Sequence, residues 1–278
     1  MTNESFASGE EQFNPFQAPT ERSSPVDAGV ARFEENVDLE RARELLPGVI
    51  RSSKITRFFL ALVILSCPFV IGVSGYAIFL LQQQVAGAEI SPESQATYLM
   101  SLLILGIFVV GTTIPLVISY CVWIYRAHRI LPSLGAVDLS TSSGWAVGYY
   151  FIPIMNLFRP YQIMVEIWNT SGPHSASSKP QLWKKQGTNA LVGWWWGMWI
   201  WTMILDRMTN VMARRMETVE AELNQEYVTV LFAIARLTAA VLLFMLISRV
   251  TQREERRLER LETAPDPVPS SSESPFNA

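Results

Sequence analysis

One arginine lies inside a long apolar stretch near the end of the chain. Arg236 sits in VTVLFAIARLTAAVLLFMLIS, nine residues after Tyr227 and thirteen before Arg249. A charge at the centre of a membrane-spanning helix costs about 2.5–3.5 kcal/mol on insertion scales, so it needs a partner, a wet cavity or a route to the interface. Asp206 and Glu226 are the acidic candidates. Two interpretations stay open: an ion or substrate contact, and a structural ion pair or outward-reaching arginine.

A second polar group begins at Asn156. This residue is a good helix cap, and Pro160 suits the first turn of a helix that starts there. Four polar residues then recur at helical spacing on one side of that helix: Arg159, Gln162, Glu166 and Asn169. The stripe predicts either an interfacial amphipathic helix with a wet polar side or a polar site facing a helical bundle. In the second case Glu166 pairs with one of three arginines: Arg126, Arg129 or Arg159.

The sequence carries none of the common catalytic or metal-binding patterns. It has no phosphate loop, no nucleophile elbow, no paired histidine ligands and no dinucleotide glycine motif. Cys67 and Cys121 lie in apolar runs, and the two histidines, His128 and His174, are far apart in sequence. We therefore expect no catalytic residues, no cofactor and no metal, and a protein that is not an enzyme.

The composition indicates the elements that must position these residues. Hydrophobic residues make up 49% of the chain and charged residues 17%, and the hydrophobic residues are gathered into long runs typical of membrane spans. Residues 1–50 hold 10 acidic and 4 basic residues, whereas residues 51–260 hold 18 basic and 12 acidic ones. The basic residues gather at the ends of the apolar runs, so a nucleic-acid partner is not expected.

The apolar runs predict an all-α integral membrane bundle of about four helices. The expected spans cover residues 58–81, 98–125, 189–205 and 227–250, inside a membrane domain at 49–250. Residues 1–48 read as a disordered acidic tail with a short amphipathic helix that Pro47 and Gly48 end. Residues 251–278 read as a charged helix followed by a second disordered tail.

The segment 144–169 is predicted to be a re-entrant or interfacial broken helix. Gly144 to Phe158 is 15 residues, about 22 Å as a helix against a membrane core of about 30 Å, and Pro153 would interrupt that helix. A segment that does not cross also keeps most basic residues on one side. The positive-inside rule then places both termini in the cytoplasm.

Two further patterns concern packing. Gly144 and Gly148, with Trp145 between them, are four residues apart, a spacing that allows a neighbouring helix to approach closely. The stretch WWWGMWIW, with five tryptophans, predicts an aromatic belt at the membrane interface that packs against 144–169, with a cation-binding cage as the alternative.

Three stretches resemble a known family. WIYRAHRILPSLG, SGWAVGYYFIPIMNLFRPYQIMVEIW and GWWWGMW together look like the mostly bacterial membrane family called domain of unknown function 4328 (DUF4328). The resemblance covers roughly residues 98–250. It implies a multi-pass membrane protein, and it implies no activity and no family catalytic residues.

Three hypotheses of function follow. The first is a non-enzymatic integral protein of the bacterial inner membrane with a scaffold, sensor or partner-binding role, whose partners are the lipid bilayer and other membrane proteins or itself. The second is a small-molecule or ion transporter or channel component, and the third is a lipid-acting membrane enzyme. The transporter hypothesis requires Asn156, Glu166 and Arg236 to line one continuous wet cavity.

Overall fold

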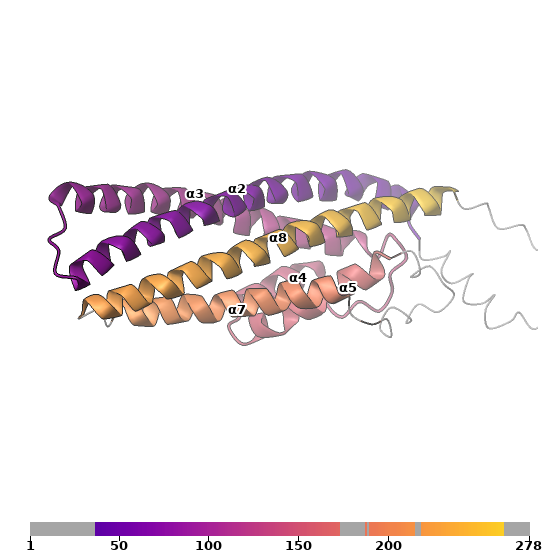
Figure 1. Cartoon of the computed structure of the whole chain (residues 1–278). Helices are drawn as coiled ribbons and strands as arrows, with labels where there is room; N and C mark the ends of the chain where they lie inside the picture. The colour runs from indigo at the N-terminus through magenta and orange to yellow at the C-terminus, as the bar shows by residue number, and fades with distance from the viewer. Residues whose placement is uncertain (1–36, 173–186, 188, 215–217, 264–278) are drawn as a thin grey trace, which may run out of the picture.

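The computed structural model describes residues 37–172, 187, 189–214 and 218–263. Four long helices lie along the axis of the molecule (Figure 1): α2 (Leu39–Val85), α3 (Pro92–Ile130), α7 (Ala190–Ala213) and α8 (Val219–Thr263). Among the described residues, α2, α3 and α8 are long and apolar enough to cross a membrane. α7 has 24 residues, a rise of about 36 Å. The predicted all-α membrane bundle of about four spans is confirmed.

The helices extend beyond the spans that the apolar runs predicted. Each predicted span lies within one long helix, apart from residue 189, which caps α7. α8 continues without a break past residue 250, so the charged segment that follows is the end of the same helix. The tails predicted to be disordered, 1–36 and 264–278, lie outside the described residues.

The expectation that Pro47 ends a short first helix is wrong. α2 starts after Asp38, whose carboxylate accepts the Arg41 backbone N–H at 2.9 Å, and it continues through Pro47. Ala42 and Val49, on either side of the proline, are both fully buried. Tertiary packing on both sides therefore outweighs the one backbone hydrogen bond that proline removes.

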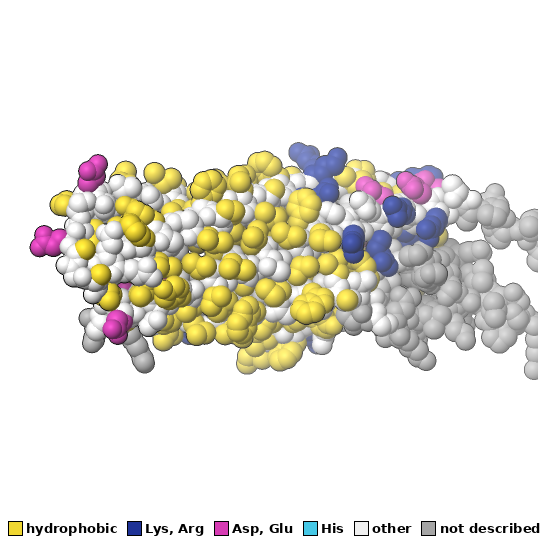
Figure 2. All heavy atoms as spheres, in the orientation of Figure 1, with side chains coloured by type: hydrophobic (Ala, Val, Ile, Leu, Met, Phe, Trp, Pro, Cys, Tyr) yellow, Lys and Arg dark blue, Asp and Glu magenta, His cyan; other side chains and the backbone are white. Residues whose placement is uncertain are grey.

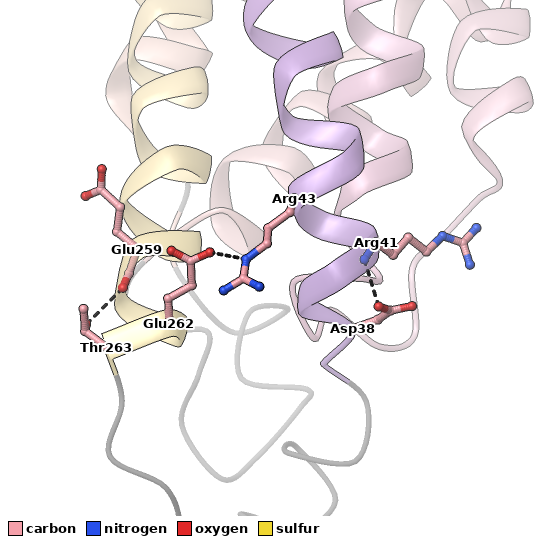
Figure 3. Close-up of polar contacts among 6 residues, drawn as sticks. All are labelled: Asp38, Arg41, Arg43, Glu259, Glu262 and Thr263. Atoms are coloured by element: carbon pink, nitrogen blue, oxygen red, sulfur yellow. Dashed lines mark hydrogen bonds and ion pairs between the residues drawn. The ribbon is translucent and has the colours of Figure 1, made fainter.

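The order of packing is α3, α2, α8, α7. α2 lies between α3 and α8, and α8 also packs along α7 (Figure 1). At the end where α2 begins and α8 finishes, Arg43 and Glu262 form an ion pair at 2.6 Å (Figure 3). α3 and α7 are thus the two outer helices of the row, and a shorter segment connects them.

That segment is a hairpin that enters and leaves at the same end of the bundle. It contains four short elements: α4 (Ser143–Gly148), η1 (Tyr149–Phe151), η2 (Met155–Leu157) and α5 (Arg159–Thr170). At its tip Ile152 is extended, with φ −97° and ψ 113°, as the residue before a proline prefers. The hairpin lies in the half of the molecule where α2 begins (Figure 1). The predicted broken helix is confirmed, and we call residues 143–170 the re-entrant hairpin.

The surface separates into an apolar band and charged ends. Figure 2 shows hydrophobic side chains covering most of the visible length, with Lys and Arg gathered where the band ends near the start of α2. Acidic side chains occupy the opposite tip (Figure 2). Such a band is the surface that a bilayer covers.

Candidate functional site

A groove of about 660 Å³ opens between the outer helices α3 and α7, with α2 and α8 at its floor and the re-entrant hairpin at one end. We call it the lateral groove. Val110 and Val117 line it and are about half exposed, at 57% and 47%, so its mouth is at the surface of the apolar band. Most of its lining is apolar, and five polar residues contribute to it: Thr113, Asn156, Thr202, Asp206 and Arg236.

Arg236 reaches from α8 across the groove to α3. Its Nη2 donates to the Thr113 hydroxyl at 2.9 Å. The hydrogen-bond acceptor is thus a hydroxyl, while Asp206, one of the two predicted carboxylates, interacts with the Arg236 charge through space. Glu226 instead accepts the Tyr98 hydroxyl at 3.3 Å, while Asp206 lines the same groove. A guanidinium held by a hydroxyl keeps most of its N–H groups available inside an apolar groove.

Asn156 lies at the hairpin end of the groove. The prediction that it caps a new helix is wrong, because α5 begins at Arg159 after Phe158 and has no side-chain cap, although Pro160 does occupy its first turn. The Oδ1 atom of Asn156 is buried, and no hydrogen-bond donor in the structure reaches it. Burying an acceptor without a donor is costly, which marks this carbonyl as a group that a ligand can satisfy.

Aromatic contacts fix the hairpin against both outer helices. The hydroxyls of Tyr120 on α3 and Tyr150 on η1 lie 2.8 Å apart. On the other side the Tyr161 ring of α5 lies 6.3 Å from that of Trp196, which stacks on Trp199 at 4.7 Å. Trp195 is buried, at 2% exposure. The expected packing of the tryptophan stretch against the hairpin is present.

Glu166 lies away from the groove. Its carboxylate accepts the backbone N–H of Ser140 at 2.6 Å and the hydroxyl of the same residue. The side chain is 2% exposed, on the buried side of α5. Both of these donors belong to the loop before the hairpin, and neither is an arginine.

The other predicted arginines are also separate from the groove. Arg126 donates from Nη1 to the Gly48 carbonyl at 2.8 Å, between α3 and α2. Arg159 donates to Gln162 at 3.1 Å and its guanidinium lies 5.2 Å from the Tyr149 ring centre. Of the five polar residues singled out from the sequence, the structure brings together Asn156 and Arg236 only.

The glycines of the hairpin do not serve as helix-contact sites. A Cβ built on Gly144 would meet nothing within 4 Å, and one on Gly148 would meet the Trp145 ring at 3.2 Å. The close approach predicted for this pair is therefore wrong. α4 does contact α3: the hydroxyl of Ser143 is 3.2 Å from Nδ1 of His128, and Ala146 of α4 is fully buried.

The sequence did not reveal a buried polar cluster near the end of α8. Arg257 donates from its two terminal nitrogens to the carbonyls of Thr170 and Leu134, and burial lowers its pKa to about 10. Glu254 is fully buried, and burial raises the pKa of its carboxyl well above the ordinary value. The 3–4–3 spacing of Thr251, Glu254, Leu258 and Leu261 was the available signal of an inward face.

The fold and the groove define an all-helical membrane bundle with a re-entrant hairpin. The chain belongs to the DUF4328 family, a domain of unknown function, because the family model matches residues 88–252, more than half of the chain. The match includes the polar residues of the lateral groove and excludes α2 and the end of α8. No curated protein and no solved structure matches the chain.

Proposed function

We propose that this is a non-enzymatic, multi-pass protein of the bacterial cell membrane that binds a single-chain amphiphile in the lateral groove, as a sensor or partner-binding component. The observation that carries the proposal is the groove itself. An apolar channel wall with a few convergent polar groups is the usual form of a small-molecule site. The ligand's chain would contact α3 and α7, and its polar head would meet Arg236 and Asn156.

The head group follows from the two polar residues. The Arg236 guanidinium favours an anionic or carbonyl oxygen, because it offers only donors. The buried Oδ1 of Asn156 requires a donor, such as a hydroxyl. A hydroxylated carboxylate or a comparable head on one acyl chain satisfies both requirements.

The distribution of charge supports cytoplasmic termini. The segment between α2 and α3, residues 86–91, has no Lys or Arg, whereas Arg51, Lys54 and Arg57 precede the apolar part of α2. Arg126 and Arg129 at the end of α3 lie at the same end of the bundle. The positive-inside rule assigns that end to the cytoplasm.

The groove supports binding better than transport. The transporter hypothesis required Glu166 to share one cavity with Asn156 and Arg236, and Glu166 does not line the groove. Its carboxylate accepts hydrogen bonds from Ser140 instead. Asn156 and Arg236 line a groove whose mouth is at the side of the bundle, on the apolar band.

Photo-crosslinking tests the proposal. The purified full-length protein in detergent is irradiated with a diazirine-bearing hydroxylated fatty acid, and labelled peptides are mapped. We expect labelling of α3 and α7 at groove positions, reduced about tenfold in Val110→Trp, which narrows the groove. Ile107→Trp is the matched control, because Ile107 is on the same helix, is 68% exposed and does not line the groove. Equal labelling of both variants would exclude the lateral groove as the site.

A further inference from the structure

A second cleft, of about 680 Å³, lies between α2 and α3 near the end where α2 begins. We call it the interfacial cleft. Its polar end is formed by Arg51 of α2 and Arg126 of α3, and Ile55, Phe59 and Ile118 line it further along the helices. Along the two helices the arginines lie nearer the end where α2 begins and α3 finishes, and the apolar residues lie nearer the middle.

The two arginines are available for an anion. Arg126 is positioned by one hydrogen bond from Nη1 to the Gly48 carbonyl, at 2.8 Å. Its guanidinium lies against Gly48, since a Cβ there would be 3.6 Å from Nη1. Arg51 is exposed and makes no hydrogen bond or ion pair with any residue that the structure describes. No acidic residue lines this cleft, and Glu44 lines a neighbouring cleft that shares Gly48, Val122 and Arg126 with it.

We propose that the interfacial cleft binds one anionic phospholipid. Its phosphate would lie between Arg51 and Arg126, because guanidinium groups bind phosphate oxygens through paired N–H donors. Its acyl chain would follow Ile55, Phe59 and Ile118 into the apolar band. Basic pockets between membrane helices at the cytoplasmic side are suited to anionic head groups. The site is independent of the lateral groove, which lies on the other face of α3 and holds none of these residues.

The amphipathic character of the cleft excludes two simpler occupants. A zwitterionic lipid brings an ammonium group close to two guanidinium groups, which repel it. Free phosphate satisfies the arginines and leaves the apolar wall uncovered. The proposal therefore requires both a net negative head and an acyl chain.

Native mass spectrometry of the purified full-length protein tests this site. The protein is incubated with dioleoylphosphatidylglycerol, with dioleoylphosphatidylcholine or with inorganic phosphate, and the retained adducts are counted. We expect one phosphatidylglycerol to remain bound, with retention about tenfold lower for phosphatidylcholine. Equal retention of the two lipids would overturn the proposal. Retention of inorganic phosphate at the level of phosphatidylglycerol would overturn it as well.

Variants locate the site. Arg51→Gln, which removes a side chain with no described partner, and Ile118→Trp, which fills the apolar part from a 59% exposed position, should each lower phosphatidylglycerol retention about tenfold. Lys54→Gln is the matched control, because Lys54 is an exposed basic residue on the same helix that lines neither cleft. A loss in Lys54→Gln as large as in Arg51→Gln would show unspecific charge attraction and refute the cleft as the site.

Discussion

Arg257, near the end of α8, donates a buried hydrogen bond to the backbone carbonyl of Thr170, the last residue of α5. The same guanidinium donates to the carbonyl of Leu134, in the loop after α3. One side chain thus joins three segments that are distant in sequence. Backbone carbonyls at the C-terminal end of a helix have no donor within that helix, and the Arg257 guanidinium supplies donors at the end of α5 and just after the end of α3.

Replacing Arg257 should destabilise the protein strongly. Arg257→Lys keeps a positive charge but cannot reproduce two donors in a planar fork. We expect a loss of about 1.5–3 kcal/mol for each hydrogen bond that is not replaced, measured from unfolding of the purified protein in detergent. Arg256→Lys, at an exposed position one residue earlier, should leave the unfolding midpoint unchanged, and equal effects of the two would contradict a special role for Arg257.

The exposed ion pair at the same end should matter little. Arg43 and Glu262 lie 2.6 Å apart with side chains 58% and 33% exposed (Figure 3). Water and salt screen such a pair. Arg43→Gln should therefore give an unfolding midpoint indistinguishable from that of the parent protein, at both low and high salt. A clear loss would mean that this pair holds the helix ends together.

Removing the partner of Arg236 should leave a poorly satisfied charge in the bundle. We expect Thr113→Val, which preserves shape and deletes the hydroxyl, to lower stability by about 1.5–3 kcal/mol. Thr238→Val is the control, because the Thr238 hydroxyl donates to the Ile234 carbonyl of its own helix and the residue is exposed. Both are compared by thermal unfolding in the same detergent, and similar losses would argue against the contact between the helices.

The buried carboxyl of Glu254 should make the stability of the protein depend on pH. Burial raises the pKa of this carboxyl above the ordinary 4.5, so the folded state holds its proton to higher pH than the unfolded state does. Stability is then lost progressively as pH rises above 4.5. Glu254→Gln removes this loss, so the variant should unfold at a higher temperature than the parent at about pH 7.5 and at a similar one near pH 4.5.

The control for that experiment is Glu259→Gln, at an exposed position of the same helix. Its unfolding midpoint should follow that of the parent protein at every pH. A Glu254→Gln variant that is less stable than the parent at neutral pH would show that the carboxylate is ionised and paired in the folded state.

The proposed topology can be tested by labelling single cysteines in intact cells. Glu89→Cys, in the segment between α2 and α3, should react with a membrane-impermeant maleimide from outside. Lys179→Cys, in the sequence between α5 and α7, should react only after the membrane is permeabilised. Cys67 and Cys121 are replaced by alanine in both variants. Labelling of Lys179→Cys from outside would exclude the topology of four spans with both termini in the cytoplasm.

The fold followed from length, apolar runs and charge, because those properties decide which segments a bilayer accepts. The same reasoning identified the re-entrant hairpin, since 15 residues from Gly144 to Phe158 are too few to cross. It failed at Pro47, where burial of Ala42 and Val49 keeps the helix intact. Local signals cannot report packing between segments that are far apart in the chain.

The residues of the lateral groove were predictable only in part, because local signals do not identify their partners on other helices. The cost of a charge in an apolar run identified Arg236, but its acceptor Thr113 is 123 residues away on another helix. Charge predicted an arginine partner for Glu166, but no pattern in the sequence indicated that the Ser140 backbone and hydroxyl donate to it. Glu254 and Arg257 were hidden in a run of charges that reads as solvated.

α8 is the one long helix, among those that the structure describes, without an internal glycine or proline. It carries Arg236 in the lateral groove and Arg257 at the far end, 21 residues further along, or about 32 Å of helical rise. The two arginines therefore belong to one uninterrupted helix. A rotation of α8 that accompanies filling of the groove would also move Arg257 relative to its acceptors, the carbonyls of Thr170 and Leu134. Occupancy of the membrane interior would in this way change the contacts at the charged end of the protein.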